Sequence, residues 1–190
     1  MVCELRRKNV PNLTIFYKVN ESFSQEEGAK KYHDNDALSK VTAYSTQYQK
    51  TANQFIDGIG VNPRQAAMEM ELLSRAYGKF SRLRLRHFQL SFSDEETRKL
   101  KRYCGSLQGV YDELDQIGWY AASYYGGQYQ IIYAVHQDTS HPHIHFVMNV
   151  VHCNTGAKYR GDKADYYRFR NYLGKFLMET YGFQPVKLSR

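Results

Sequence analysis

Cysteines are few in this chain of 190 residues, and long apolar runs are missing. The three cysteines, Cys3, Cys104 and Cys153, are odd in number and far apart, and none makes a CxxC pair. This pattern excludes a disulfide framework and favours a reducing cytoplasm. No run of about 18 apolar residues occurs, which argues against a transmembrane helix. The opening MVCELRRKN has no apolar stretch behind its charges, so we expect no secretory signal.

Repeats, low-complexity tracts and linkers rich in proline, glycine or serine are missing as well. The length therefore favours one domain, or one domain with an extra arm, and is sufficient for a real core.

Positive charge and tyrosine are abundant. Lysine and arginine number 26 against 19 acidic residues, which gives a net charge of +7 and favours a polyanionic partner. The 17 tyrosines offer many surfaces on which bases could stack. Together these features favour a nucleic acid as the partner.

Apolar periodicity predicts both strands and helices. Strands are expected at residues 13–19, 83–92, 129–135 and 143–151. Helices are expected from Asn35 or Asp36 to about 49, from Asn62-Pro63 to Gly78, from Ser93 to about 125 with a break near Gly105, and over roughly 163–181. The polar residues 20–35 are expected to form a loop or a short helix. Because strands and helices do not alternate strictly, we predict an α+β fold, a central mostly antiparallel sheet with flanking helices.

Four of the seven histidines fall within VHQDTSHPHIHFVMN, residues 135–149. Residues two apart on a strand project from the same face, so the imidazoles of His143 and His145 point one way while the intervening apolar side chains point into the core. His136 ends the preceding strand and lies beside this pair if the short link folds back. Three converging neutral imidazoles make a divalent metal site with open positions, and Asp138 could orient one of them.

Two other interpretations of these histidines stay open. A lone histidine on a strand is usually a satisfied core or surface residue, although a cluster of four makes that explanation weak. A structural zinc site would close with a fourth ligand, often cysteine, and Cys153 beside His152 is available.

The pattern His136-x-Asp138-Thr139, then His143-x-His145, then Asn149 resembles motif III of plasmid and transposon relaxases, the MOB-P group of the HUH endonuclease superfamily. RHFQLSFS (86–93) resembles the motif II strand of this group, with Ser91 as its serine. ALSKVTAYSTQYQKT (37–51) resembles motif I, a helix with a tyrosine followed by Lys-Thr. The resemblance covers about residues 36–185. It implies a single relaxase domain over 1–190, with 1–35 as a divergent N-terminal arm.

The resemblance implies a DNA relaxase that nicks one strand at an origin of transfer, for conjugative transfer or mobilisation. Tyr44 is the implied nucleophile, and its attack would leave a 5′-phosphotyrosine and a free 3′-hydroxyl. A tyrosine hydroxyl, with an ordinary pKa of about 10, needs help to attack near neutral pH. Tyr48 would share the face of Tyr44 on one helix and is an alternative. Tyr32 is a more distant candidate.

The resemblance also assigns the other site residues. The implied ligands of a divalent ion, Mg²⁺ or Mn²⁺ in the cell with Zn²⁺ or Ni²⁺ possible in crystals, are His136, His143 and His145. Ser91 would contact the DNA near the scissile phosphate, and Asp138 would support the histidines or act as a base. Asn149, on the histidine face of its strand, would orient the phosphate or a ligand.

Basic residues are expected to line a groove for the DNA. They are Arg82, Arg84 and Arg86 at the start of the 83–92 strand, and a second group that includes Lys158 and Arg160 among tyrosines. The implied partners are single-stranded or hairpin origin-of-transfer DNA, relaxosome accessory proteins and a coupling protein, in a bacterial cytoplasm. Relaxases commonly carry long C-terminal regions, so the chain is also compatible with a nuclease fragment.

Three rivals share part of these signals. HPHIHFV (141–147) alone matches a histidine-triad nucleotide hydrolase, in which His143 would attack without a metal. A non-catalytic DNA-binding module would keep the fold and bind hairpin DNA without an adduct. A replication initiator or transposase of the same superfamily would place its tyrosine after the histidines, whereas Tyr44 precedes them.

Overall fold

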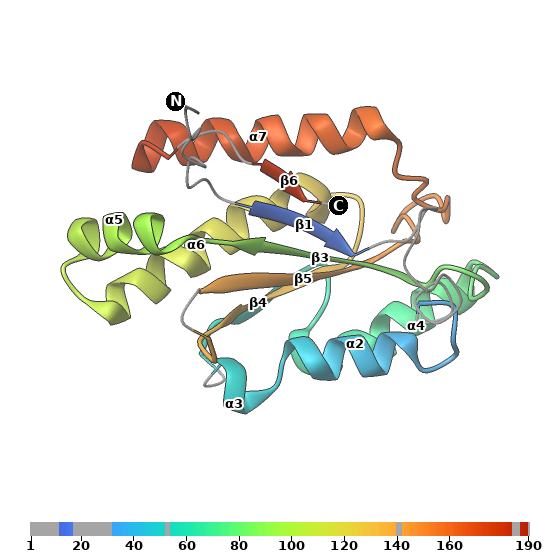
Figure 1. The fold of residues 1–190 in the computed structure, drawn as a ribbon. Coiled ribbons are helices and arrows are strands. Elements are labelled where there is room, and N and C mark those ends of the chain that lie inside the picture. Colours follow the sequence, from blue (N-terminus) through green and yellow to red (C-terminus); the bar gives the residue numbers. More distant parts are fainter. Residues whose placement is uncertain (1–11, 17–31, 52–53, 140–141, 184–186, 190) are drawn as a thin grey trace, which may run out of the picture.

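A six-stranded sheet forms the centre of the described residues, in the order β2-β4-β5-β3-β1-β6 (Figure 1). The computed structural model describes residues 12–16, 32–51, 54–139, 142–183 and 187–189. The strands are β1 (Asn12–Phe16), β2 (Ile56–Ile59), β3 (Leu85–Ser91), β4 (Ile131–His136), β5 (His143–Asn149) and β6 (Lys187–Ser189). Paired strands are antiparallel except β1 and β6, which are parallel. The predicted α+β class is confirmed.

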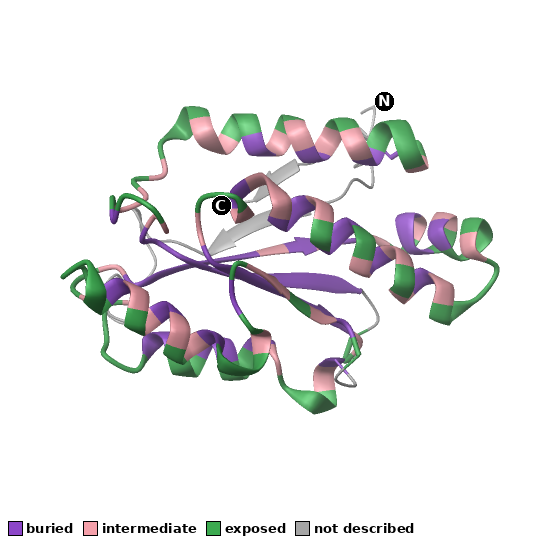
Figure 2. Ribbon diagram, turned by 180° about the vertical axis from the view of Figure 1, so that it is seen from behind, coloured by how far each residue is buried: buried purple, intermediate pink, exposed green. Residues whose placement is uncertain are grey.

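Helices cover both faces of this sheet (Figure 1). One face carries α2 (Ala37–Ser45), α3 (Tyr48–Thr51) and α4 (Ala66–Ala76), which a short 3-10 turn (Pro63–Gln65) precedes. The other face carries α6 (Leu107–Gly126) and α7 (Lys163–Tyr181), with α5 (Asp94–Cys104) packed against α6. Figure 2 shows that the buried residues of these helices face inward, towards the sheet. None of the helices in the described ranges is long and apolar enough to span a membrane.

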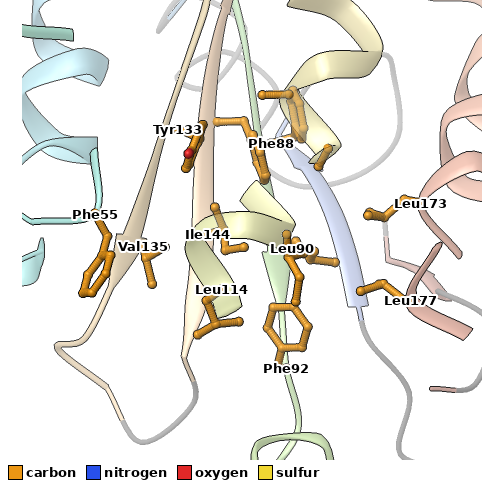
Figure 3. Close-up of a cluster of buried hydrophobic side chains, with 14 of the residues drawn as sticks. Phe55, Phe88, Leu90, Phe92, Leu114, Tyr133, Val135, Ile144, Leu173 and Leu177 are labelled. Atoms are coloured by element: carbon orange, nitrogen blue, oxygen red, sulfur yellow. The ribbon is translucent and has the colours of Figure 1, made fainter. Parts of the chain in front are cut away.

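Side chains alternate along the strands and so create two apolar clusters. The larger cluster lies between the sheet and the helices α6 and α7, and it includes Phe88, Leu114 and Ile144 (Figure 3). The smaller cluster packs α2 and α4 against the opposite face, through residues such as Val147. His143 and His145 share the alternation of Val147, so they project from the α2 side of the sheet.

Several helices begin or end at the residues that the local sequence predicts. Ser93 and Glu96 form the capping box that starts α5, and Gly105, at φ 72°, ends it. Asn62 accepts a hydrogen bond from the Arg64 amide at the start of the turn before α4. The last helix has the predicted bounds, 163–181, and it buries Phe169, Leu173 and Leu177, which form an apolar stripe at helical spacing.

The structure also departs from the predicted elements. The helix predicted to reach about 49 divides into α2 and α3, and at the break the hydroxyl of Thr46 donates to the carbonyl of Thr42. β2, a four-residue edge strand containing Asp57 and Gly58, and the short β6 were not predicted, because neither carries an apolar alternation. The 13–19 strand is present as β1, while 17–19 lie outside the described residues, as does most of the 20–35 segment.

Candidate metal centre and its surroundings

Three histidines meet at one end of the β4–β5 pair. His136, the last residue of β4, pairs directly with His143, the first residue of β5, and His145 follows two residues later on the same face. One ring nitrogen from each of the three lies within 4.8 Å of the others. The structure thus brings together the three residues named from the sequence as metal ligands.

The hydrogen bonds of His136 and His145 leave one ring nitrogen of each for this shared space. His136 donates from Nε2 to the Ser45 carbonyl at 2.8 Å, and its buried Nδ1 has no hydrogen-bond partner among the described residues. His145 Nδ1 lies 2.8 Å from His87 Nε2, which leaves Nε2 of His145. A buried nitrogen with a lone pair and no partner is costly unless it binds a proton donor or a cation, so the donor set fits a divalent metal ion.

Burial sets the charge of these imidazoles. Desolvation lowers the pKa of His136 and, more strongly, that of His145, and the neighbouring histidines lower both pKa values further. Both rings are therefore neutral near pH 7. A neutral imidazole is the form that binds a metal.

Tyr44 reaches this cluster from α2. Its ring centroid lies 5.6 Å from that of His145 and 6.2 Å from that of His136, and the residue is 44% exposed. The next residue, Ser45, is the one whose carbonyl accepts the hydrogen bond from His136. Helix α2 is therefore fixed to the same histidine that Tyr44 approaches.

The two alternative tyrosines have different environments. Tyr48 lies on α3, beyond the break after α2, and is 67% exposed, so it does not share one helix face with Tyr44. Tyr32 is half-buried, its hydroxyl lies 3.2 Å from His87 Nδ1, and burial raises its pKa to about 12. The phenol of Tyr32 is thus harder to ionise than an ordinary one.

Lys50 connects Tyr44 with Asp138. The Lys50 ammonium lies 3.8 Å from the Tyr44 ring centroid and 3.8 Å from Asp138 Oδ2. Asp138 Oδ1 in turn lies 3.9 Å from His136 Nδ1. Sequence reasoning used Lys50 only to mark the position of the tyrosine and missed this contact.

Ser91 lies at the edge of the cluster. It pairs directly with His143 across β3 and β5, and its hydroxyl accepts a hydrogen bond of 2.6 Å from the Gln89 side chain. His87, on the same face of β3, stacks on His145 with ring centroids 5.0 Å apart. The period of two along this strand already places His87 on the same face as Gln89 and Ser91, but the sequence does not show what His87 contacts.

Arg86 does not reach a DNA-accessible surface. It lies on the Phe88 side of β3, it is 3% exposed, and its guanidinium donates to the hydroxyls of Tyr125 and Tyr159. Asp165 lies 4.0 Å away and accepts hydrogen bonds from the same two hydroxyls. The predicted DNA contact of Arg86 is therefore corrected to a buried network that joins β3 to α6 and α7.

Arg84 and Asn149, which were also predicted to contact DNA, are buried as well. Arg84 is buried, and its guanidinium donates to the His33 carbonyl and the Asn35 side chain. Asn149 is fully buried and donates to the Met70 carbonyl and the Gln130 side chain. Asn149 also lies six residues along β5 from His143, about 20 Å at the rise of a strand. Asn149 therefore lies on the same face of the sheet as the clustered histidines, but at the opposite end of β5.

The other predicted DNA contacts lie away from the cluster. Arg82 and Arg160 are exposed, and Arg82 has a positive φ of 57°. Lys158 is half-buried and donates to the Ser81 and Leu83 carbonyls. Arg82 precedes β3 and Lys158 contacts the residues just before it, so these two cations lie towards the Leu85 end of the strand, whereas Ser91, opposite His143, ends it.

Cys153 does not complete a closed zinc site with the clustered histidines. It follows the end of β5, whereas His143 and His145 lie at its start, and the group that could hold a metal in the described residues contains the three histidines alone.

Residues 32–182 match the family model described as "Relaxase: MobA/VirD2-like, nuclease domain". No curated protein and no solved structure matches the chain. The matched range contains both α2, with Tyr44, and the three clustered histidines, and it argues against a histidine-triad hydrolase.

Proposed function

Because the chain belongs to the MobA/VirD2-like relaxase family by its nuclease domain, we propose that it nicks one strand of an origin-of-transfer DNA with Tyr44 as the nucleophile. DNA nicking is the general activity of relaxases. The tyrosine, the adduct, and a role in conjugative transfer or mobilisation are the specific parts of this proposal. The accessory proteins, the coupling protein and the bacterial cytoplasm expected from the resemblance belong to it as well.

The contact of Tyr44 with the histidine cluster carries the proposal. The ring lies 5.6 Å from that of His145, yet 44% of the residue remains exposed for a DNA strand to approach. The bond from His136 to the Ser45 carbonyl fixes the helix of the nucleophile relative to the cluster. Such positioning is a large part of catalysis in phosphoryl transfer.

In the proposed reaction the Tyr44 oxygen forms a bond to the scissile phosphorus, and the bond from phosphorus to the 3′ oxygen breaks. The phenol loses its proton, to Asp138 or to solvent, and the 3′ oxygen gains one. Lys50, held between the Tyr44 ring and Asp138, compensates negative charge that develops as the phenol attacks. The products are a 5′-phosphotyrosine and a free 3′-hydroxyl.

His136, His143 and His145 would hold a divalent ion, because one ring nitrogen of each lies within 4.8 Å of the others. Such an ion polarises a phosphate and stabilises its developing negative charge. The family favours Mg²⁺ or Mn²⁺ as the working ion, whereas three imidazoles by themselves suit Zn²⁺ or Ni²⁺.

Ser91, opposite His143 at the edge of the cluster, is the proposed contact with the DNA beside the scissile phosphate. Arg82 and Arg160, with Lys158 nearby, are proposed to bind phosphates of the same DNA far from the cut. Because Arg82 and Lys158 lie towards the Leu85 end of β3 and Ser91 ends the strand, the DNA would extend along the sheet. Hairpin or single-stranded origin DNA fits this arrangement.

The test is to incubate the protein with single-stranded DNA that carries its nick site and to look for an adduct that survives denaturing electrophoresis. Tyr44→Phe keeps the ring, so it should fold and bind DNA but form no adduct. Tyr48→Phe is the matched control and should keep most of the adduct. EDTA, or His143→Ala, should abolish nicking.

Loss of the adduct in Tyr48→Phe but not in Tyr44→Phe would move the nucleophile and leave the enzyme class intact. DNA binding without cleavage by the unmodified protein under all metal conditions would indicate a non-catalytic DNA-binding module and overturn the proposal.

A further inference from the structure

A chain of hydrogen bonds leads away from the histidine cluster through His87 to Tyr32. Nδ1 of His145 lies 2.8 Å from Nε2 of His87, and Nδ1 of His87 lies 3.2 Å from the Tyr32 hydroxyl. The two imidazoles also stack, with centroids 5.0 Å apart and an interplanar angle of 23°. The motif comparison with relaxases gave neither His87 nor Tyr32 a role in holding the histidines.

The fold fixes both outer members of this chain. His87 is buried on β3, diagonal to His145 on the same sheet face. The carbonyl of Tyr32 accepts a hydrogen bond from the Arg84 amide at 3.0 Å, while its hydroxyl reaches His87. The buried Arg84 guanidinium binds His33 and Asn35, which follow Tyr32. Tyr32 is therefore held at its backbone and at its hydroxyl.

A metal ion at the cluster would fix the direction of every hydrogen bond in this chain. A ligating nitrogen presents a lone pair, so Nε2 of His145 carries no proton and Nδ1 must carry it. Nδ1 of His145 then donates to Nε2 of His87, which leaves the proton of the neutral His87 ring on Nδ1. That proton is donated to the Tyr32 oxygen.

We propose that His87 and Tyr32 are positioning residues that hold the His145 ring in the tautomer and orientation needed for metal binding. The proposal rests on the metal site of the proposed function. His87 acts as the hydrogen-bond acceptor that ligating histidines require, a role usually filled by a carboxylate, a backbone carbonyl or water. Neither His87 nor Tyr32 contacts the substrate in this assignment.

The first measurement is Mn²⁺ affinity, by titration calorimetry of the full chain. His87→Phe keeps a ring on His145 but removes the acceptor, and its affinity should fall about 10- to 100-fold. His87→Gln restores an acceptor oxygen and should recover part of the loss. Tyr32→Phe should cause a smaller loss. His152→Phe is the matched control, because His152 is a half-buried histidine beyond the far end of β5, and it should bind Mn²⁺ as the unmodified protein does.

The second measurement separates positioning from packing. Long-range proton–nitrogen NMR spectra of ¹⁵N-labelled protein loaded with Zn²⁺, which is diamagnetic, should show the proton of His145 on Nδ1 and that of His87 on Nδ1. In Tyr32→Phe the His87 signal should change while the thermal midpoint stays close to that of the unmodified protein.

Unchanged Mn²⁺ affinity in His87→Phe would overturn this inference alone. A proton on Nε2 of metal-loaded His145 would overturn it and would also remove His145 from the ligands of the proposed function. If His87→Phe does not fold, the test relies on His87→Gln and Tyr32→Phe. The inference would be overturned if both variants bound Mn²⁺ as tightly as the unmodified protein and if Tyr32→Phe left the His87 signal unchanged. If the unmodified protein binds no divalent ion, both this inference and the metal site of the proposed function fail.

Discussion

The buried histidines should make the stability of the metal-free protein depend on pH. Burial lowers the folded-state pKa of His136 and His145, while an unfolded histidine titrates near 6.5. Below pH 6.5 the unfolded chain therefore binds protons that the folded protein excludes. The free energy of unfolding should fall as the pH falls through this range, and it should level off above it.

The magnitude follows from linkage. His145 is 3% exposed and its folded pKa is strongly depressed, so its contribution approaches about 1.4 kcal/mol per pH unit well below pH 6.5. Between pH 7.5 and pH 5.5 the integrated loss is about 1.4 kcal/mol for one such histidine. His136, whose pKa is also lowered, adds to this loss.

The assay is urea unfolding in EDTA at pH 7.5 and pH 5.5, for the unmodified protein and for His145→Gln. Glutamine does not titrate, so the variant should lose about 1.4 kcal/mol less than the unmodified protein between the two pH values. Carboxylates such as Glu96, whose pKa burial raises, titrate in both proteins and largely cancel in the difference. The same pH-dependent loss in both proteins would refute the buried neutral state of His145.

Two further predictions concern the basic residues. Arg86→Met removes one member of a buried charge network, so it should lower the free energy of unfolding, measured by urea denaturation, by about 3–5 kcal/mol. The salt dependence of DNA binding should not change. An unaltered urea midpoint would contradict this prediction. Replacing both Arg82 and Arg160 by Gln should weaken binding to single-stranded origin DNA and flatten its salt dependence by about one counterion per lost phosphate contact, whereas Lys175→Gln, the control on α7, should not. Equal slopes in the double variant and the unmodified protein would remove these two residues from the DNA surface.

Much of the fold is readable from local sequence, because its signals act over a few residues. The capping box at Ser93 and Glu96 and the stripe of 163–181 each specify a helix boundary or a helix face without long-range contacts. The edge strand β2 could not be found this way. It contains Asp57 and Gly58, and it exists because β4 offers it a hydrogen-bonding partner.

The sequence by itself determined that His143 and His145 share one face, since a strand has a period of two, and that His136 lies one short link away. The same period of two puts Arg86 on the face of Phe88, which is a core residue, so Arg86 also points towards the core. The sequence interpretation of Arg86 as a DNA contact overlooked this consequence.

Only the tertiary structure decided which residues of a face lie at which end of the sheet. Strand register places Ser91 opposite His143 and Asn149 opposite Leu85, so the serine joins the cluster and the asparagine does not. It also brings His87 against His145, 58 residues apart in the chain. Periodicity fixes the direction of a side chain, but distance along a sheet depends on the pairing between strands, which no local pattern encodes.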